Sequence, residues 1–268
     1  MLKVLMSMIK KTTIFLFLFI NINALFSQII KVEYYTFTKN TIDTTGIKSY
    51  LLFDKDKSLF VWKSIYQEVT NTKEANNEGV TKINVKKIFR DTIGRRVFNK
   101  YSDKKLILRE PFLEKNFKLL DSKLDIDWKI TDEIKYFDKI KCRKAKGHFR
   151  GRNYIVWYTL EFPVPTGPWK LNGLPGLIIE AYDEKREVNF LFKKLYNCKK
   201  CIKKIGIDNN VEIISIKNFI EQRDELYLKE INKNLSKLPR GTKIIKSSFK
   251  KRKGIELIYE WESETKEN

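Results

Sequence analysis

The chain has 268 residues, and 54 Lys and Arg against 33 Asp and Glu give it a formal net charge of +21. Lysine outnumbers arginine 43 to 11, and lysines occur in every segment of the chain. Nucleic-acid sites usually concentrate arginine and aromatic side chains on one face, so this dispersed charge argues against a specific nucleic-acid partner. The length suits a single domain of an all-β or α+β fold.

Residues 1–27 have the parts of a cleavable secretion signal. Positive side chains come first, an apolar run follows at 14–20, and a suitable cleavage position precedes Gln28. The apolar run is shorter than the roughly twenty residues that a transmembrane helix needs. A secretion signal of this composition can start at either Met1 or Met8. We therefore expect a cleaved signal at 1–27 and one mature domain at 28–268, in the periplasm or beyond and without a transmembrane segment.

Most of the mature chain is predicted to form strands. Between about 30 and 63, aromatic and β-branched runs flank a polar turn at 54–57 that suits a hairpin. Residues 70–82 lack periodicity and are expected to form a loop. The run at 153–162 is apolar at both sets of alternating positions, which predicts a strand covered on both faces. Other strands are expected at 96–101, 106–109, 128–130, 134–137, 139–149, 177–182, 188–193 and 255–261.

One long helix is expected at about 216–236, where apolar residues recur at intervals of four and seven. Ser215 is placed to cap its start, and the Pro-Arg-Gly sequence at 239–241 ends it. Together the elements predict a β-rich α+β fold. We expect a large curved antiparallel sheet, like a half-barrel or an open barrel, with the long C-terminal helix packed on it.

The stretch at 163–180 is unusually rigid, since it holds four of the six prolines and three of the eleven glycines. Leu174-Pro175-Gly176-Leu177 predicts a type II turn, because proline sets φ near about −65° and Gly176 can adopt a positive φ. Constrained turns hold their neighbours in fixed directions. The stretch is therefore either a structural corner that feeds a central strand or the rigid rim of a binding surface.

This stretch resembles the signature of the GLPGLI family, secreted proteins of Gram-negative bacteria whose hexapeptide stands here as Gly173 to Ile178. Gly167-Pro168-Trp169-Lys170 and, further upstream, Cys142 and Arg150-Gly151-Arg152 are similar to the family pattern. The resemblance implies a location and a fold more than a mechanism, and it carries no catalytic residue.

If the stretch is a rim, aromatic side chains on a curved sheet that no second sheet closes can line a groove for an apolar or sugar-like ligand. The expected binding residues are then Trp157, Pro168, Trp169, Gly173, Leu174, Pro175, Gly176 and Leu177.

Residues able to carry chemistry are few. His148 is the single histidine, which excludes a multi-histidine metal site, and no Gly-x-Ser-x-Gly nucleophile elbow accompanies it. Cys198 and Cys201 have the spacing of redox and zinc pairs, but an oxidising compartment favours a local disulfide that leaves Cys142 buried and unpaired. We therefore expect no catalytic residue, no metal and no cofactor.

These observations favour a non-catalytic binding or accessory protein of the cell envelope. It would hold an apolar ligand in the concavity of the sheet, or assist an outer-membrane transporter or another envelope protein. The alternative is an envelope hydrolase or a thiol- or metal-dependent enzyme that uses Cys198, Cys201 or His148. Polar side chains converging on one deep pocket would favour the enzyme.

Overall fold

The computed structural model describes residues 28–38, 47–63, 72–75, 81–84, 93–112, 115–201, 205–207, 212–236 and 254–263. The expected secretion signal at 1–27 lies outside the described residues. Twelve strands form one large sheet: β1 (Ile30–Thr38), β2 (Ile47–Phe53), β3 (Lys57–Trp62), β6 (Arg95–Lys100), β7 (Lys105–Phe112), β8 (Lys115–Ser122), β9 (Lys129–Phe137), β10 (Ile140–Phe149), β11 (Arg152–Thr159), β12 (Leu177–Asp183), β13 (Val188–Asn197) and β14 (Ile213–Ser215).

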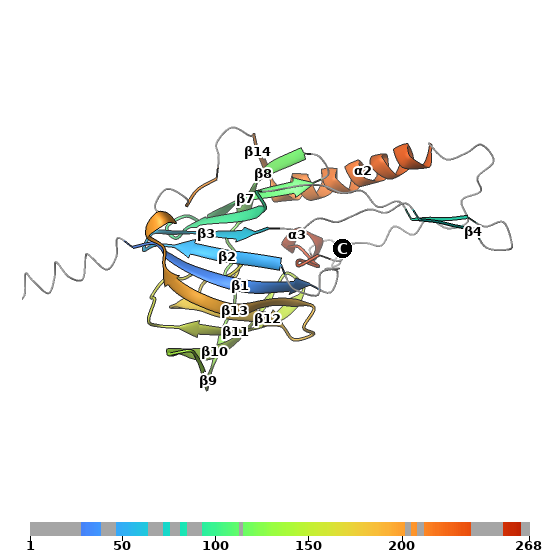
Figure 1. The fold of residues 1–268 in the computed structure, drawn as a ribbon. Coiled ribbons are helices and arrows are strands. Elements are labelled where there is room, and N and C mark those ends of the chain that lie inside the picture. The colour runs from blue at the N-terminus through green and yellow to red at the C-terminus, as the bar shows by residue number, and fades with distance from the viewer. Residues whose placement is uncertain are drawn as a thin grey trace, which may run out of the picture.

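The sheet is open, and its strand order is β14-β8-β7-β6-β3-β2-β1-β13-β12-β11-β10-β9 (Figure 1). Neighbours pair antiparallel except β14 and β8, which are parallel. One edge is the three-residue β14 and the other is the nine-residue β9. The prediction of a β-rich fold with a large, unclosed sheet is confirmed.

Local sequence accounts for most of these strands. The expected hairpin joins β2 to β3, because Oδ1 of Asp54 accepts hydrogen bonds from the backbone N–H groups of Asp56 and Lys57, both at 2.9 Å. In β11, Tyr154, Val156, Trp157 and Tyr158 are all buried, so this strand is covered on both faces as predicted.

Three strand predictions were wrong. The loop expected at 70–82 contains β4 (Thr72–Ala75) and the start of β5 (Thr81–Asn84), which form a separate two-stranded sheet. The two strands expected at 128–130 and 134–137 are one strand, β9. The closing strand expected at 255–261 is absent, and the chain runs irregularly into the short helix α3 (Glu260–Ser263). There the N–H groups of Leu257 and Ile258 bond to the carbonyl of Arg150 instead of joining a strand ladder.

The expected helix is α2 (Ile216–Leu235). Ser215 caps its start as predicted, because its Oγ accepts a hydrogen bond of 3.1 Å from the N–H of Asn218. Phe219 is buried, and its ring meets those of Phe112 on β7 and Phe117 on β8, with centroid distances of 6.1 and 5.0 Å. The first turns of α2 therefore pack on the sheet, while Figure 1 shows its other end directed away from it. No helix among the described residues is long and apolar enough to span a membrane.

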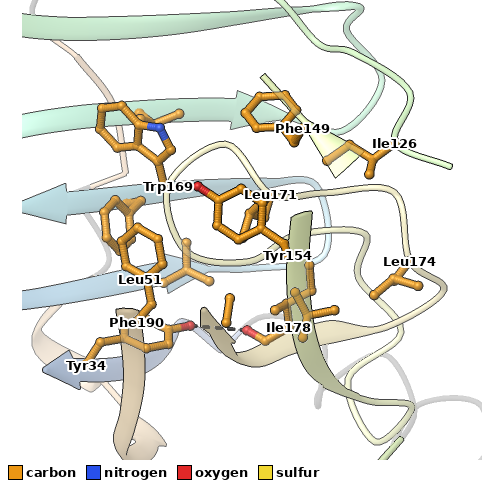
Figure 2. Close-up of a cluster of buried hydrophobic side chains, with 14 of the residues drawn as sticks. Tyr34, Leu51, Ile126, Phe149, Tyr154, Trp169, Leu171, Leu174, Ile178 and Phe190 are labelled. Carbon is orange, nitrogen blue, oxygen red and sulfur yellow. Dashed lines mark hydrogen bonds between the residues drawn. The ribbon is translucent and has the colours of Figure 1, made fainter. Parts of the chain in front are cut away.

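The signature stretch lies on the face of the sheet that we call the inner face, which carries Tyr34, Phe60 and Phe190. Figure 2 shows Trp169, Leu171 and Leu174 of this stretch among side chains of β1, β2, β11, β12 and β13. The Trp169 ring meets the rings of Phe60 and Trp62 edge-on, at 6.5 and 5.8 Å between centroids. Burying a large apolar side chain stabilises a fold by about 1.5–3 kcal/mol. The stretch is therefore a central part of the core.

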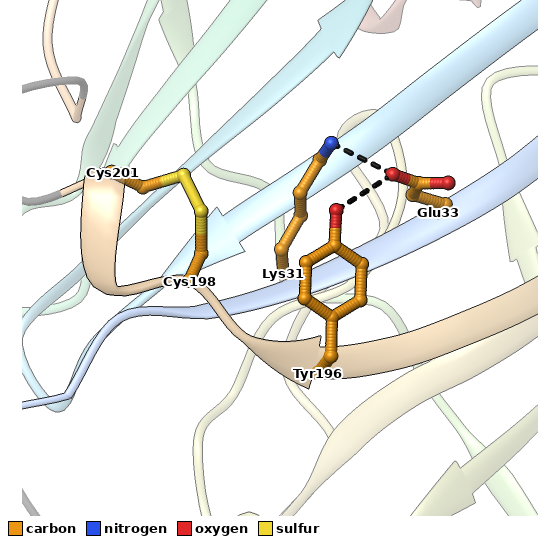
Figure 3. Close-up of a disulfide and its surroundings, with 5 residues drawn as sticks. All are labelled: Lys31, Glu33, Tyr196, Cys198 and Cys201. Atoms are coloured by element: carbon orange, nitrogen blue, oxygen red, sulfur yellow. Dashed lines mark hydrogen bonds and ion pairs between the residues drawn. A yellow bond between two sulfur atoms is a disulfide. The ribbon is translucent and has the colours of Figure 1, made fainter.

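A smaller core lies on the outer face of the sheet. Cys198 and Cys201 form a disulfide in the structure, which packs with Leu52, Leu59 and Val61. Figure 3 shows this disulfide near a polar group on β1 and β13. In that group Glu33 accepts hydrogen bonds of 2.8 Å from Lys31 Nζ and from the hydroxyl of Tyr196. The disulfide thus packs on the outer core beside the start of β1 and the end of β13.

Candidate functional site

The structure places most of the expected rim residues inside the protein. Trp169 is 8% exposed, Leu174 is 2% exposed and Leu177 is fully buried. Pro168 and Gly176 are also buried, and within the hexapeptide only Gly173 and Pro175 are exposed. This burial favours the structural corner, which is one of the two interpretations that the sequence left open. Only a small part of the signature is exposed to solvent.

The predicted type II turn at Leu174 to Leu177 is wrong, because Gly176 does not have a positive φ. The positive φ belongs to Gly173, at 95°. Gly176 is needed for a different reason. A Cβ at this position would lie 2.1 Å from the carbonyl oxygen of Thr159, so the hexapeptide can approach the end of β11 only with glycine there.

Trp157 is separated from Trp169 by the sheet. Side chains alternate along a strand, so Trp157 points away from the inner face that Val156 and Tyr158 occupy. On that outer side Lys135 Nζ lies 5.6 Å from the Trp157 ring and 3.1 Å from Glu180 Oε1. The two tryptophans therefore do not line one groove.

A buried network of charged side chains joins four segments of the chain. Arg150, at the bend between β10 and β11, uses all five N–H groups of its guanidinium on carboxylates. Nη1 and Nη2 donate to Asp121 on β8 at 2.8 and 2.7 Å, Nη1 also donates to Glu256 at 2.8 Å, and Nε and Nη2 donate to Glu260 at 2.8 and 3.2 Å. The Arg150 and Asp121 side chains are each 1% exposed.

Lys170 brings the signature stretch into this network. Its Nζ lies 2.7 Å from both Asp121 Oδ2 and Glu256 Oε1. Burial alone would raise the pKa of Asp121, but the charges and hydrogen bonds of Lys170 and Arg150 outweigh it and hold that pKa below its usual value. Burial would lower the pKa of Arg150, but its carboxylate partners outweigh that effect and raise it. Asp121 and Arg150 are therefore both charged at neutral pH and paired with each other.

Arg152 extends the same arrangement to the C-terminal segment. It pairs with Asp183 at 2.8 Å and Glu187 at 3.1 Å, and it donates to the carbonyls of Ile255 and Gly254 at 2.8 and 2.9 Å. The two arginines of the bend thus hold residues 254–260 against the sheet. The charged groups are directed at one another, which supports a structural role. We call the paired charges of Asp121, Arg150, Arg152, Lys170, Glu256 and Glu260 the clamp.

The residues considered for an enzyme are not brought together. His148 is exposed, and its Nδ1 lies 2.8 Å from Asn153 Oδ1. Burial raises the pKa of the Cys142 thiol to about 12, so it stays protonated. Cys198 and Cys201 are joined to each other on the outer face. Among the residues that the structure describes, no three His, Cys, Asp or Glu side chains are grouped so as to hold a metal ion.

The free edge at β9 carries an exposed apolar surface, which we call the edge face. It consists of Ile130, Ile134 and Tyr136 on β9 and Leu160 just after β11, with exposures of 45, 51, 62 and 56%. The three β9 residues share one face because they are separated by even numbers of positions. Arg143 on β10 pairs with both Ile134 and Tyr158, and Leu160 follows Tyr158 just beyond the end of β11.

The edge face adjoins the exposed part of the hexapeptide. A Cβ on Gly176 would lie 3.4 Å from the Cα of Leu160, so the Pro175-Gly176 unit lies directly against the end of β11. Pro175 is exposed at this point. The small solvent-facing part of the signature thus lies next to Leu160, one of the four residues of the edge face.

Sequence reasoning missed both the charged network and the edge face. Lys170 did carry a signal, because it is the one charge between Pro163 and Ile179, whereas Arg150 and Arg152 follow a segment that is already strongly basic. Their partners Asp121 and Glu256 carried none, because nothing local marks them as buried. The spacing of Ile130, Ile134 and Tyr136 could have indicated an apolar strand face, but not that this strand ends the sheet.

The fold and its clamp define a β-rich protein built around an open twelve-stranded sheet. A family model described as "Protein of unknown function (Porph_ging)" matches residues 148–180, which include the Arg-Gly-Arg bend, Lys170 and the whole hexapeptide. No curated protein matches the chain.

Six chains of solved structures match, among them PNGF-II in two crystal forms. The P21 form is 14% identical, covers 72% of this chain and 32% of its own, and has a TM-score of 0.50. The C2 form is 14% identical, covers 74% of this chain and 33% of its own, and has a TM-score of 0.49. The chain thus spans about a third of the length of these structures, and the likeness concerns the fold alone.

Proposed function

We propose that this chain is a non-catalytic binding or accessory protein of the cell envelope that acts through a protein partner. One contrast carries the proposal. The charged side chains of the interior are committed to one another, whereas four apolar side chains of the edge face are open to solvent. Exposed apolar groups that lie together on a surface often mark an interaction site.

The filled interior favours a protein partner over an apolar ligand held in the concavity. Trp169, Leu171 and Leu174 occupy the inner face where such a ligand would lie (Figure 2). An outer-membrane transporter or another envelope protein is then the preferred class of partner.

The envelope location rests on sequence. Residues 1–27 have the composition of a secretion signal, and the hexapeptide at Gly173 to Ile178 supports placing the chain with GLPGLI-type secreted proteins. The Cys198–Cys201 disulfide is in keeping with an oxidising compartment.

The enzyme alternative has less support. A hydrolase would need His148 beside a nucleophile, but its bonded neighbour is the Asn153 side chain. A thiol enzyme would need an ionised thiol, whereas the raised pKa of Cys142 keeps that thiol protonated.

Native mass spectrometry of the full chain purified from cell-envelope fractions tests the proposal. We expect an N-terminus near Gln28 and a stoichiometric complex with a polypeptide, unchanged in the variants His148→Ala and Cys142→Ser. Recovery from the cytoplasm with residues 1–27 intact would contradict the location. A covalent acyl or thiol adduct that the Cys142→Ser or His148→Ala variant abolishes would support the enzyme instead.

A further inference from the structure

We propose that the partner docks on β9 as an extra strand and that the docking segment is extended, acidic and apolar at alternate positions. This inference rests on the proposed function and specifies the surface and the chemistry of the partner.

β9 is the one long strand that ends the sheet in the part of the chain that the structure describes. It has nine residues and a single neighbour, β10, and it lies at the free lower edge of the sheet in Figure 1. An edge strand presents unpaired backbone N–H and C=O groups, which can bond to an added strand. Natural edge strands usually carry charges that discourage pairing. The outer side of β9 does so, through Glu133 and Lys135.

The other side of β9 is more apolar. Ile130, Ile134 and Tyr136 project from it at exposures of 45 to 62%, and the exposed Leu160 lies just beyond the end of β11. The one charged β9 residue on this side, Asp132, is paired with Arg143 at 3.3 Å. In strand addition the main chain supplies affinity, and alternate side chains supply specificity by meeting the apolar side chains of the edge. A docking strand with apolar side chains at alternate positions would cover this row.

The net positive charge of the hairpin formed by β9 and β10 favours an acidic partner. Residues 129–149 contain seven basic and three acidic side chains, a net charge of +4. Two of the acids are already neutralised, because Asp132 pairs with Arg143 at 3.3 Å and Glu133 pairs with Lys144 at 2.8 Å. The exposed lysines at 129, 139, 141 and 146 have no ion pair within the described residues. A second copy of the chain would bring a like charge to this edge and would be repelled.

A peptide-binding experiment on the full mature chain tests this assignment. The probe is a fluorescent nine-residue peptide in which glutamate alternates with valine and isoleucine. Its matched controls are the same peptide with lysine for glutamate, and a version with N-methyl groups on the backbone nitrogens of one strand edge. We expect the acidic peptide to bind, with affinity falling as salt rises, and the lysine peptide to bind at least about tenfold more weakly. Methylation of the edge that faces β9 should abolish binding, and methylation of the opposite edge should not.

Variants locate the binding surface. The Ile134→Thr/Tyr136→Thr double variant places β-branched residues at two exposed positions and should still fold, yet it should bind about tenfold more weakly. Ile213→Thr, at another exposed position on the opposite edge strand, should bind as the wild type does. Lys141→Gln should reduce the salt dependence, and Lys55→Gln, in the turn between β2 and β3, should not.

Several results would overturn the assignment. One is that the double variant binds the acidic peptide as tightly as the wild type does, and another is that the lysine peptide binds as tightly as the acidic one. A third is that the chain forms dimers which the double variant converts to monomers. The last is that the edge binds phosphatidylglycerol vesicles and does not bind the peptide. The proposed function is judged separately. If the envelope complex persists in the folded double variant, the edge assignment fails while the proposed function stands.

Discussion

Lys170 Nζ lies 2.7 Å from Asp121 Oδ2, and each of these side chains is only 1% exposed. Asp121 is on β8, the second strand of the sheet, whereas Lys170 belongs to the stretch between β11 and β12, near the other end of the strand order. The contact therefore spans the inside of the sheet and holds its two halves around a common core. The signature stretch supplies the charge that makes this contact.

Removing the Lys170 charge should destabilise the protein strongly. Lys170→Met leaves Asp121 and Glu256 buried with one partner fewer, and breaking a buried ion pair from one side costs about 3–5 kcal/mol. Urea unfolding of the variant measures the loss. Lys55→Met is the matched control, because its pair with Asp56 is exposed and such pairs contribute about 0–1 kcal/mol. Similar losses for the two variants would argue against the clamp.

Stability should fall in acid through Asp121. Its pKa in the folded protein is held below the unfolded value of about 3.9, so the folded state binds this proton less readily than the unfolded state does. The stabilisation is complete above that unfolded value and is lost as the pH falls through the folded pKa. Acid unfolding followed by circular dichroism should show this loss. Asp121→Asn should be less stable at neutral pH and should lose less on acidification, and an unchanged acid slope in this variant would assign the effect to other carboxylates.

Gly176→Ala should be costly although the residue lacks a positive φ. The added methyl group would lie 2.1 Å from the Thr159 carbonyl oxygen, and such overpacking costs about 1–3 kcal/mol. Gly206→Ala is the matched control, because a Cβ there would have no atom within 4 Å. Thermal melting compares the two variants. Equal melting temperatures would mean that the hexapeptide can move away from β11 without loss.

The cysteines should give one free thiol in unfolded, unreduced protein and none that reacts quickly in the folded protein. Cys198 and Cys201 are joined to each other, and Cys142 is buried with its pKa raised to about 12, so little thiolate is available to react. Titration with a thiol reagent before and after unfolding measures both states. Three free thiols, or fast reaction of Cys142 in the folded protein, would contradict this arrangement.

The sequence correctly predicted the features that a few adjacent residues determine. The turn at 54–57, the cap at Ser215 and the twofold apolar pattern of β11 each arise from a few adjacent residues, and the structure has them. The predictions that failed depend on distant segments. Residues 255–261 have the composition of a strand, but the carbonyl of Arg150 accepts the N–H groups of Leu257 and Ile258. Gly176 was expected to serve a turn, whereas the Thr159 carbonyl in β11 is what requires glycine there.

The candidate site shows the same difference between features set by local sequence and features set by distant segments. The sequence marked 163–180 as the organising stretch, and the structure gives that stretch the core position and the Lys170 contacts. The sequence could not show that Trp169 points inward, because burial depends on which strands surround it. Nor could it show that Ile134 and Tyr136 stay exposed, since their pattern equals that of a buried strand until the strand order is known.

Hydrogen–deuterium exchange of the full chain, free and in the proposed envelope complex, separates partner binding at the edge face from binding at the signature. We expect amides of β9, at 129–137, to gain protection in the complex, while those at 169–178 are protected in both states because the signature belongs to the core. Protection gained at 163–178 with β9 unchanged would contradict this expectation and would return the binding site to the signature.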